Sequence, residues 1–481
     1  MDPSQTETLS ATIAGGPGPA TIPRALLDLQ ARLGAAAVLI GPSVPERNRS
    51  DWSSQAPARP LAVVRPTDAA GVSAALKACA AAGLKAVPQG GLTGLCGGAR
   101  PDDGWVAISL ERMTGVEEID PASSTMTVKA GTPLEAVQRA ADDAGLFFAL
   151  DLGARGSCAI GGNLSTNAGG NRVIRYGMTR ELVLGLEVVL PDGTVITNLN
   201  KMLKNNAGYD LKQLFIGSEG TLGIVTRIVL KLHAKPACTM AALCAVNDYA
   251  RVVDVLRAAR AGVGPLLSAF EVMWPDYWQV VTERGKVQAA VGKGHAQYIL
   301  IEAQGTDEAL DAPRFQAWLE DLMEQGLLAD AAVAQSLADV QGFWALRDAC
   351  AEFNQVIGPH VSYDVSLPVG RMHEFAVQCK AALTAQAGAE SIYYGHIGDG
   401  NLHLVSWVDG KALTEQPKPA MDDAIYGLVK AFGGSVSAEH GIGTQKKKWL
   451  GHSRSDAEIA LMRTLKRALD PQGVLNPGKV I

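Results

Sequence analysis

Three of the chain's eight histidines gather in two short stretches near its C-terminal end. The first stretch, YYGHIGDGNLHL (393–404), places His396 and His403 on either side of a Gly-Asp-Gly turn. The second, SAEHGIG (437–443), places Glu439 beside His440 among small residues. Two neutral imidazoles and a carboxylate, with one coordination position left open, form a common catalytic metal set. These residues therefore predict metal-assisted chemistry in this part of the chain.

The turn between the first two histidines decides whether their side chains can meet. His396 and His403 are seven residues apart, and on an unbroken strand an odd spacing points side chains to opposite faces. Asp399 and Gly400 can bend or reverse the strand, which lets the imidazoles converge. A single histidine is more often a satisfied core or surface residue, but the nearby carboxylate and third imidazole favour the functional interpretation. Asp399 has a plainer alternative role, which is to shape the turn.

The region that carries the first stretch, residues 237–430, alternates long helices with strands. Helices are expected at 249–261, 312–325 and 370–387, and strands at 298–303, 360–365 and 402–408. This pattern predicts an α+β arrangement in which helices back an antiparallel sheet. A further helix is expected at 456–469.

The preceding region, residues 55–236, contains shorter elements. Strands are expected at 59–66, 85–88, 105–110, 125–129, 183–190, 195–197 and 224–232, and helices at 69–82 and 134–144, after a first helix at 22–34. Thr67 or Asp68 can cap the helix that Gly83 ends, and the Pro-Asp-Gly at 191–193 is a hairpin signal.

Two glycine-rich blocks interrupt these elements: QGGLTGLCGG (89–98) and DLGARGSCAIGGNLSTNAGG (151–170). Neither block is a Walker loop or a G-x-G-x-x-G motif. Both are rich enough in glycine for backbone N–H groups to approach a diphosphate closely. For one block alone, tight turns would explain the glycines equally well. Two such blocks favour a phosphate-binding role.

Composition narrows the class of protein. A chain of 481 residues is expected to form two or three domains, and its net charge of −6 argues against a nucleic-acid partner. Seven dispersed cysteines without a C-x-x-C pair predict reduced thiols. The first 23 residues are polar and carry no targeting pattern, so a disordered tail is expected there. No apolar run is long enough for a membrane helix, and the sequence predicts a cytoplasmic protein.

Five segments together resemble the FAD-linked oxidases of the vanillyl-alcohol-oxidase type: 88–98, 151–170, 175–177, 208–223 and 475–479. Within that superfamily the chain resembles the D-2-hydroxy-acid dehydrogenases, which include D-lactate and D-2-hydroxyglutarate dehydrogenases. The resemblance covers residues 55–481. It implies a two-lobed FAD-binding domain and an α+β substrate (cap) domain on an antiparallel sheet. The expected parts are 1–54 (tail and leading helix), 55–236 (FAD-binding domain), 237–430 (substrate domain) and 431–481 (completing the flavin and metal site).

The resemblance also implies which residues hold FAD. The first loop is expected to wrap the diphosphate, the second block and a third segment to line the flavin and adenine, and the C-terminal asparagine to approach the isoalloxazine. These residues are Pro88, Gln89, Gly90, Gly91, Leu92, Thr93, Gly94, Leu95, Asp151, Leu152, Gly153, Gly156, Ser157, Gly161, Gly162, Thr166, Ala168, Glu219, Gly223, Ile224, Val225 and Asn476. Some members attach FAD through a histidine of the first loop, which this chain lacks, so non-covalent binding is expected.

The resemblance assigns His396, His403 and Glu439 as ligands of a divalent metal, Zn²⁺ or Mn²⁺. The implied reaction is oxidation of a D-2-hydroxy acid to a 2-oxo acid. The metal would hold the carboxylate and hydroxyl of the substrate and lower the hydroxyl pKa. His440 would accept the hydroxyl proton as general base, and the C2 hydride would pass to flavin N5.

Arg347, Tyr363 and Asn401 match family positions around the substrate, with the arginine expected to bind the carboxylate. Enzymes that act on D-2-hydroxyglutarate typically carry a threonine and a lysine where this chain has Ala351 and Ser362. This departure puts 2-hydroxyglutarate in doubt and gives weight to a smaller or more apolar hydroxy acid.

The expected partners are a small 2-hydroxy acid and an electron acceptor such as electron-transfer flavoprotein, a quinone or a cytochrome. Two alternatives remain: a flavin oxidase that uses O₂, and a non-catalytic flavoprotein subunit that relays electrons. The second alternative would have little need of the clustered histidines and Glu439.

Overall fold

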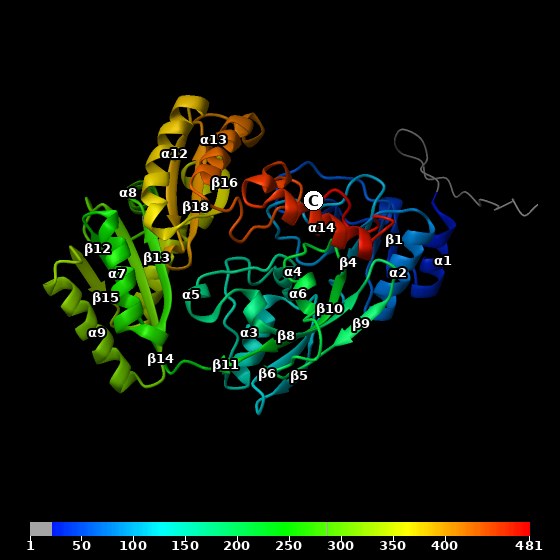
Figure 1. The fold of residues 1–481 in the computed structure, drawn as a ribbon, viewed down its shortest axis with the longest axis horizontal. Coiled ribbons are helices and arrows are strands. Elements are labelled where there is room, and N and C mark those ends of the chain that lie inside the picture. The colour runs from blue at the N-terminus through cyan, green and yellow to red at the C-terminus, as the bar shows by residue number, and fades with distance from the viewer. Residues whose placement is uncertain (1–21, 286) are drawn as a thin grey trace, which may run out of the picture.

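The computed structural model describes residues 22–285 and 287–481 and forms two lobes side by side (Figure 1). The expected disordered tail lies almost wholly outside the described residues. Directly after it, α1 (Arg24–Leu33) confirms the first predicted helix.

The first lobe, drawn from blue to green in Figure 1, contains two larger sheets and one small one. A four-stranded sheet has the order β1-β2-β4-β3, with the last three strands parallel, and a five-stranded antiparallel sheet has the order β5-β6-β10-β8-β9. The two remaining strands, β7 and β11, pair with each other. The strands are β1 (Val38–Ile40), β2 (Ala62–Val64), β3 (Ala86–Gln89), β4 (Val106–Ser109), β5 (Val116–Asp120), β6 (Thr125–Lys129), β7 (Leu146–Phe147), β8 (Val183–Val189), β9 (Val195–Asn198), β10 (Ile224–Lys231) and β11 (His233–Ala234). The helices after α1 are α2 (Ala69–Ala81), α3 (Leu134–Asp143), α4 (Ile160–Ser165), α5 (Val173–Tyr176) and α6 (Lys212–Phe215).

Local signals explain several of these boundaries. The Asp68 side chain accepts a hydrogen bond from the backbone N–H of Gly71 at 2.8 Å and caps α2, as predicted. Gly83, with φ of 65°, follows the end of that helix in the left-handed region. Strands β8 and β9 pair as an antiparallel hairpin around Gly193, whose φ is 83°.

The second lobe is built on one antiparallel sheet of seven strands, in the order β15-β12-β14-β13-β17-β18-β16. Its strands are β12 (Cys238–Val246), β13 (Leu267–Met273), β14 (Gln297–Gly305), β15 (Asp330–Val333), β16 (Val361–Ser366), β17 (Glu390–Gly395) and β18 (Asn401–Trp407). Its helices are α7 (Tyr249–Gly262), α8 (Pro275–Gln279), α9 (Glu308–Glu324), α10 (Leu337–Asp348), α11 (Phe353–Val356), α12 (Met372–Ala387) and α13 (Lys418–Ala431). The predicted α+β fold with an antiparallel sheet is confirmed.

Helices cover both faces of this sheet and create two separate cores. In β12, Ala242 and Cys244 pack with α7, α9, α12 and α13, while Ala241 and Leu243 pack with α8, α10 and α11. Side chains alternate between the faces of a strand, so a strand covered on both faces is apolar throughout. This is why β12 shows no polar–apolar alternation in the sequence. The active-site residues described below lie on the face covered by α10.

The C-terminal segment returns to the first lobe, where α14 (Asp456–Leu469) is drawn in red (Figure 1). Beyond it, Leu475 forms a parallel bridge with Ala86 of β3, and the N–H of Asn476 donates to the Ala86 carbonyl at 2.9 Å.

The domain boundaries expected from the sequence stay predictions. In the described part of the chain, no helix is both long and apolar enough to cross a membrane.

Candidate active site

The first histidine stretch folds as a hairpin between neighbouring strands. Strand β17 ends at Gly395, a short 3-10 turn covers Ile397–Asp399, and β18 begins at Asn401. Gly400 has φ of 96°, in the left-handed region that lets the chain reverse. As a result, the ring centroids of His396 and His403 lie 5.2 Å apart.

Glu439 joins the two histidines from the C-terminal segment. One ligand atom from each of His396, His403 and Glu439 lies within 4.8 Å of the other two. Two imidazoles and a carboxylate at these separations suit Zn²⁺ or Mn²⁺ after a small closure. The structure thus brings the three predicted ligands together, and the residues present fit the metal, whose presence stays a prediction.

Glu271 of β13 lies behind this triad and contacts two charged partners. Its Oε1 is 2.6 Å from His396 Nδ1, and its Oε2 accepts from Arg347 Nε at 2.7 Å. Burial lowers the pKa of His396, but the Glu271 carboxylate outweighs burial and raises that pKa to about 9. Burial raises the pKa of Glu271, but His396 and Arg347 outweigh it and hold that pKa at about 2. With Nδ1 directed at Glu271, the Nε2 atom of His396 is the one left for a metal.

Arg347, on α10, is buried beside the triad. Its Nη2 lies 3.2 Å from His396 Nε2, and its guanidinium lies over the Tyr394 ring at 5.1 Å. Only 4% of the arginine is exposed. A buried, fixed guanidinium next to the proposed metal ligands is suited to bidentate binding of a carboxylate.

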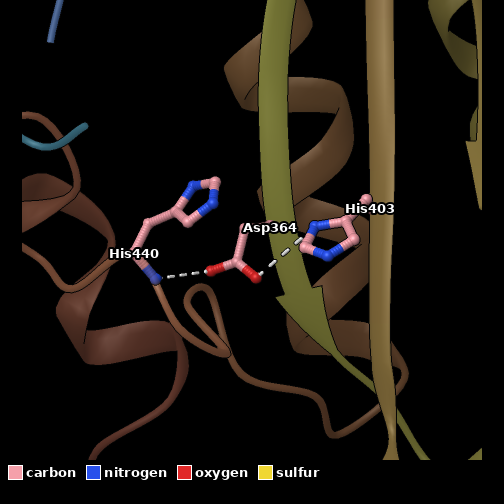
Figure 2. A group of neighbouring side chains, drawn as sticks. All are labelled: Asp364, His403 and His440. Carbon is pink, nitrogen blue, oxygen red and sulfur yellow. Dashed lines mark hydrogen bonds and ion pairs between the residues drawn. The ribbon is translucent and has the colours of Figure 1, made fainter. Parts of the chain in front are cut away.

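His440 and His403 share a buried neighbour, Asp364 of β16. Figure 2 shows Asp364 between the two histidines, with its carboxylate bonded to the backbone N–H of His440 at 3.0 Å. Burial, and then the charge of His396, hold the pKa of His403 well below its usual value. Burial also lowers the pKa of His440, against an opposing effect of Asp364. Both imidazoles are therefore neutral at neutral pH, and a neutral imidazole can bind a metal or accept a proton.

Asn401 and Tyr363 fall on opposite faces of the sheet. Asn401, two residues before His403, shares its face, and neither polar atom of its amide has a partner among the described residues. The Tyr363 ring is buried in the core on the face covered by α12 and α13, and its hydroxyl donates to Asp422 at 2.8 Å. The structure therefore brings Asn401 to the site but not Tyr363, because Tyr363 alternates with its neighbour Asp364 along β16.

The two glycine-rich blocks meet in the first lobe. A Cβ on Gly91 would collide with the carbonyl oxygen of Ser157, and a Cβ on Gly90 would lie 3.3 Å from that of Ala159. The third predicted segment joins them, because a Cβ on Gly220 would overlap the Pro88 ring. Such close backbone packing leaves N–H groups accessible to a phosphate.

Backbone strain marks the same segments. In the described residues, seven non-glycine residues have positive φ, and four of them lie in predicted FAD-binding segments: Leu92, Asn167, Glu219 and Asn476. Such conformations cost free energy and gather at functional sites. The Asn476 amide donates to the carbonyls of Gly98 (3.1 Å) and Glu219 (2.9 Å), while its Oδ1 has no partner among the described residues. An unpartnered buried oxygen beside the glycine blocks fits a flavin N–H donor.

Glu219 has a structural task as well. Its carboxylate accepts hydrogen bonds from the backbone N–H groups of Ile442 (2.7 Å) and Gly443 (2.8 Å). It therefore joins the first lobe to the loop that carries Glu439. Contact of Glu219 with FAD stays a prediction, as do the contacts of the other FAD-binding residues named from the sequence.

Sequence reasoning missed Glu271 and left Asp364 without a role. Each is a buried carboxylate and the only charged residue of its strand, LSAFEVM for Glu271 and VSYDVS for Asp364. A buried charge is costly unless it is paired, so an isolated acid in such a strand was the available signal.

Comparison with known proteins gives the family. The family model for the FAD binding domain matches residues 60–198, and the model for the C-terminal domain of FAD linked oxidases matches residues 235–480. The chain belongs to the FAD-linked oxidases, as the resemblance of its five segments implied. It is an FAD-linked oxidoreductase, and its cofactor is FAD.

Relatives and solved structures agree with this family. The chain is 40% identical to D-2-hydroxyglutarate dehydrogenase of Xanthomonas citri pv. viticola over 96% of this chain and 97% of the relative. It is 38% identical to the mitochondrial D-2-hydroxyglutarate dehydrogenase of Bos taurus over 92% and 81%. The fold is similar to p-cresol methylhydroxylase, with a TM-score of 0.78 at 18% identity over 95% and 96%. It is also similar to 4-ethylphenol oxidase from Gulosibacter chungangensis, with a TM-score of 0.75 at 18% identity over 95% and 96%.

Proposed function

We propose that this enzyme oxidises a D-2-hydroxy acid to the 2-oxo acid with non-covalently bound FAD and a divalent metal, Zn²⁺ or Mn²⁺. The observation that carries the proposal is the convergence of His396, His403 and Glu439 within 4.8 Å, beside the buried Arg347. A metal ion beside a buried guanidinium suits a small anion that also offers a hydroxyl group. The names of the relatives support the substrate class.

Each side chain has a distinct part in this chemistry. Arg347 binds the substrate carboxylate, and the unpartnered amide of Asn401 orients the substrate. His440, neutral and next to the metal ligand Glu439, accepts the proton of the substrate hydroxyl. When bound, the metal supplies a Lewis acid for the hydroxyl and FAD supplies the acceptor for the C2 hydride.

Two candidate substrates follow from different observations. The relatives favour D-2-hydroxyglutarate. Against this, Ala351 and Ser362 replace the threonine and lysine expected for a second carboxylate. Ala351 lies one helical turn beyond Arg347, and Ser362 shares a strand face with Asp364. A smaller acid such as D-lactate is therefore the second candidate, and one relative from Schizosaccharomyces pombe is named a putative D-lactate dehydrogenase.

The electron acceptor and the compartment belong to the proposal as well. Electron-transfer flavoprotein, a quinone or a cytochrome is the expected acceptor, with O₂ and a purely relaying role as the alternatives. Several relatives are named mitochondrial, so a cytoplasmic location stays a prediction.

The function is tested with purified, FAD-containing protein and an artificial electron acceptor. We expect oxidation of a D- but not an L-2-hydroxy acid, lost after treatment with a strong chelator while FAD stays bound. His440→Ala should lower kcat by about 10²–10⁴-fold with FAD content unchanged, because the hydroxyl proton loses its acceptor. Unaltered turnover in that variant would contradict the assigned base, and activity that survives metal removal would contradict the metal.

A further inference from the structure

Asp364 is a fully buried carboxylate at the centre of the site, and no step of the proposed reaction uses it. We propose that Asp364 is the positioning residue that sets both the loop bearing Glu439 and His440 and the metal-binding nitrogen of His403. This inference rests on the proposed metal site. It assigns one task to each carboxylate oxygen.

The first task belongs to Oδ2, which anchors the loop. This oxygen accepts from the consecutive backbone N–H groups of Ala438 (3.0 Å), Glu439 (2.9 Å) and His440 (3.0 Å), and from the Ser437 hydroxyl at 3.3 Å. Three successive N–H groups that converge on one anion fix the backbone of the loop. The directions in which Glu439 and His440 leave that backbone are fixed with it.

The second task belongs to Oδ1, which faces His403. This oxygen has no hydrogen-bond partner among the described residues, and it lies 3.9 Å from His403 Nδ1 (Figure 2). The distance exceeds a hydrogen bond, but a carboxylate charge acts strongly across a buried site and favours the ring hydrogen on Nδ1. A neutral imidazole carries one N–H, so the lone pair is left on Nε2.

His396 repeats the arrangement on the neighbouring strand. Its Nδ1 is 2.6 Å from the Glu271 carboxylate, so its Nε2, which lies 3.2 Å from Arg347 Nη2, is the nitrogen left to bind a metal. Each proposed histidine ligand therefore has a buried carboxylate behind it. Carboxylates in this position fix the ring orientation and the tautomer of metal-binding histidines.

A second cation site is the competing explanation for the same residues. One ligand atom from each of Asp364, His403 and His440 also lies within 4.8 Å of the others. However, the Lys446 ammonium lies 3.7 Å from Asp364 Oδ2 and donates to the Asp364 carbonyl at 3.1 Å. That ammonium and the three backbone N–H groups already compensate the charge of the carboxylate, which favours the positioning role.

Asp364→Asn keeps the hydrogen bonds to the loop and removes the negative charge that faces His403. The amide oxygen of asparagine can still accept from the loop N–H groups, which turns its NH₂ group toward His403 and disfavours hydrogen on Nδ1. We expect Zn²⁺ affinity of the FAD-containing protein to fall by about 10–100-fold in competition with a chromogenic chelator. FAD content should stay close to that of the unaltered protein, while the unfolding temperature should fall because the buried Lys446 ammonium loses its counter-charge.

Glu187→Gln is the matched control, because Glu187 is a buried carboxylate in β8 of the first lobe that accepts from Thr226 and Thr197. It should leave Zn²⁺ affinity unchanged. Equal Zn²⁺ affinity in Asp364→Asn and the unaltered protein would overturn the inference while leaving the proposed function intact. Two Zn²⁺ ions per chain, one of them lost in the variant, would also overturn it in favour of the second cation site. An unaltered protein that binds no Zn²⁺ would remove the proposed metal site and the inference together.

The tautomer can be measured without changing Asp364. In unaltered, metal-free protein labelled with ¹⁵N-histidine, the His403 signals are identified by their absence in His403→Gln. We expect the shift pattern of a neutral ring with hydrogen on Nδ1. Hydrogen on Nε2 would overturn the inference even if Asp364→Asn failed to fold.

Discussion

At the scale of single residues, the Glu271 carboxylate connects the proposed metal-binding and substrate-binding parts of the site. It bonds the proposed metal ligand His396 through one oxygen and the proposed substrate-binding Arg347 through the other. Removal of a carboxylate paired on both sides would leave a buried positive charge uncompensated. The proton that Glu271 holds on His396 also determines how metal binding responds to pH.

Zn²⁺ affinity is expected to rise with pH up to about 9, because the metal must displace a proton from His396, whose pKa is raised to about 9. Below that pKa, His396 alone contributes about a tenfold gain in affinity per pH unit. Competition titrations from about pH 7 to about pH 9 measure the slope. Glu271→Gln removes the group that raises the pKa, so its affinity should level off at a lower pH. A flat profile in the unaltered protein would show that His396 is neutral before the metal arrives.

At the scale of elements, close backbone packing joins parts of the chain that are distant in sequence. The first glycine-rich loop follows β3, the second block surrounds α4, and the loop after α6 closes on both. In the second lobe, the β17–β18 hairpin brings His396 and His403 together. Glycine is required where one backbone touches another, and not merely where the chain turns.

Gly91→Ala is expected to destabilise the FAD-free protein by about 1–3 kcal/mol, since its Cβ would collide with the Ser157 carbonyl and force the two blocks apart. Thermal unfolding measures the loss, and flavin absorbance should show reduced FAD content after purification. Gly94→Ala is the matched control in the same loop, because a Cβ there meets no described atom within 4 Å. An unfolding temperature lowered equally by both variants would contradict the packing explanation.

At the scale of the whole molecule, Arg172 ties the two lobes together. Arg172 follows the second glycine-rich block and donates to Asp151 of that block at 2.7 Å. It also donates to Glu302 of β14, in the other lobe, at 3.0 and 3.3 Å. Ser268 and Trp344 complete the shell around Glu302, each at 2.8 Å. The Arg172 guanidinium thereby bridges an acid of the first lobe and an acid of the second.

Arg172→Ala should cost about 3–5 kcal/mol, because it leaves the buried Glu302 carboxylate without its cation. We expect urea unfolding, measured by flavin and tryptophan fluorescence, to begin at a lower urea concentration. Arg24→Ala, which breaks the exposed pair with Asp28, is the control and should leave the curve unchanged. A single unshifted transition in Arg172→Ala would show that other contacts hold the lobes.

The sequence by itself determined the family, the two glycine-rich blocks, the α+β class and the three residues that converge as a metal set. Those signals are local: a Gly-Asp-Gly turn, dense glycine, and helices with clear caps such as Asp68. Several strands escaped notice, β12 and β13 among them, because a strand buried on both faces shows no alternation.

Only the tertiary structure revealed the charges behind the ligands. Glu271 lies 125 positions before His396 in the chain, and the contact between them exists because their strands are neighbours in the sheet. It also decided that Asn401 faces the site while Tyr363 faces the opposite core, under α12 and α13. Strand register sets which side chains share a face, and register is fixed by the packing of the whole sheet.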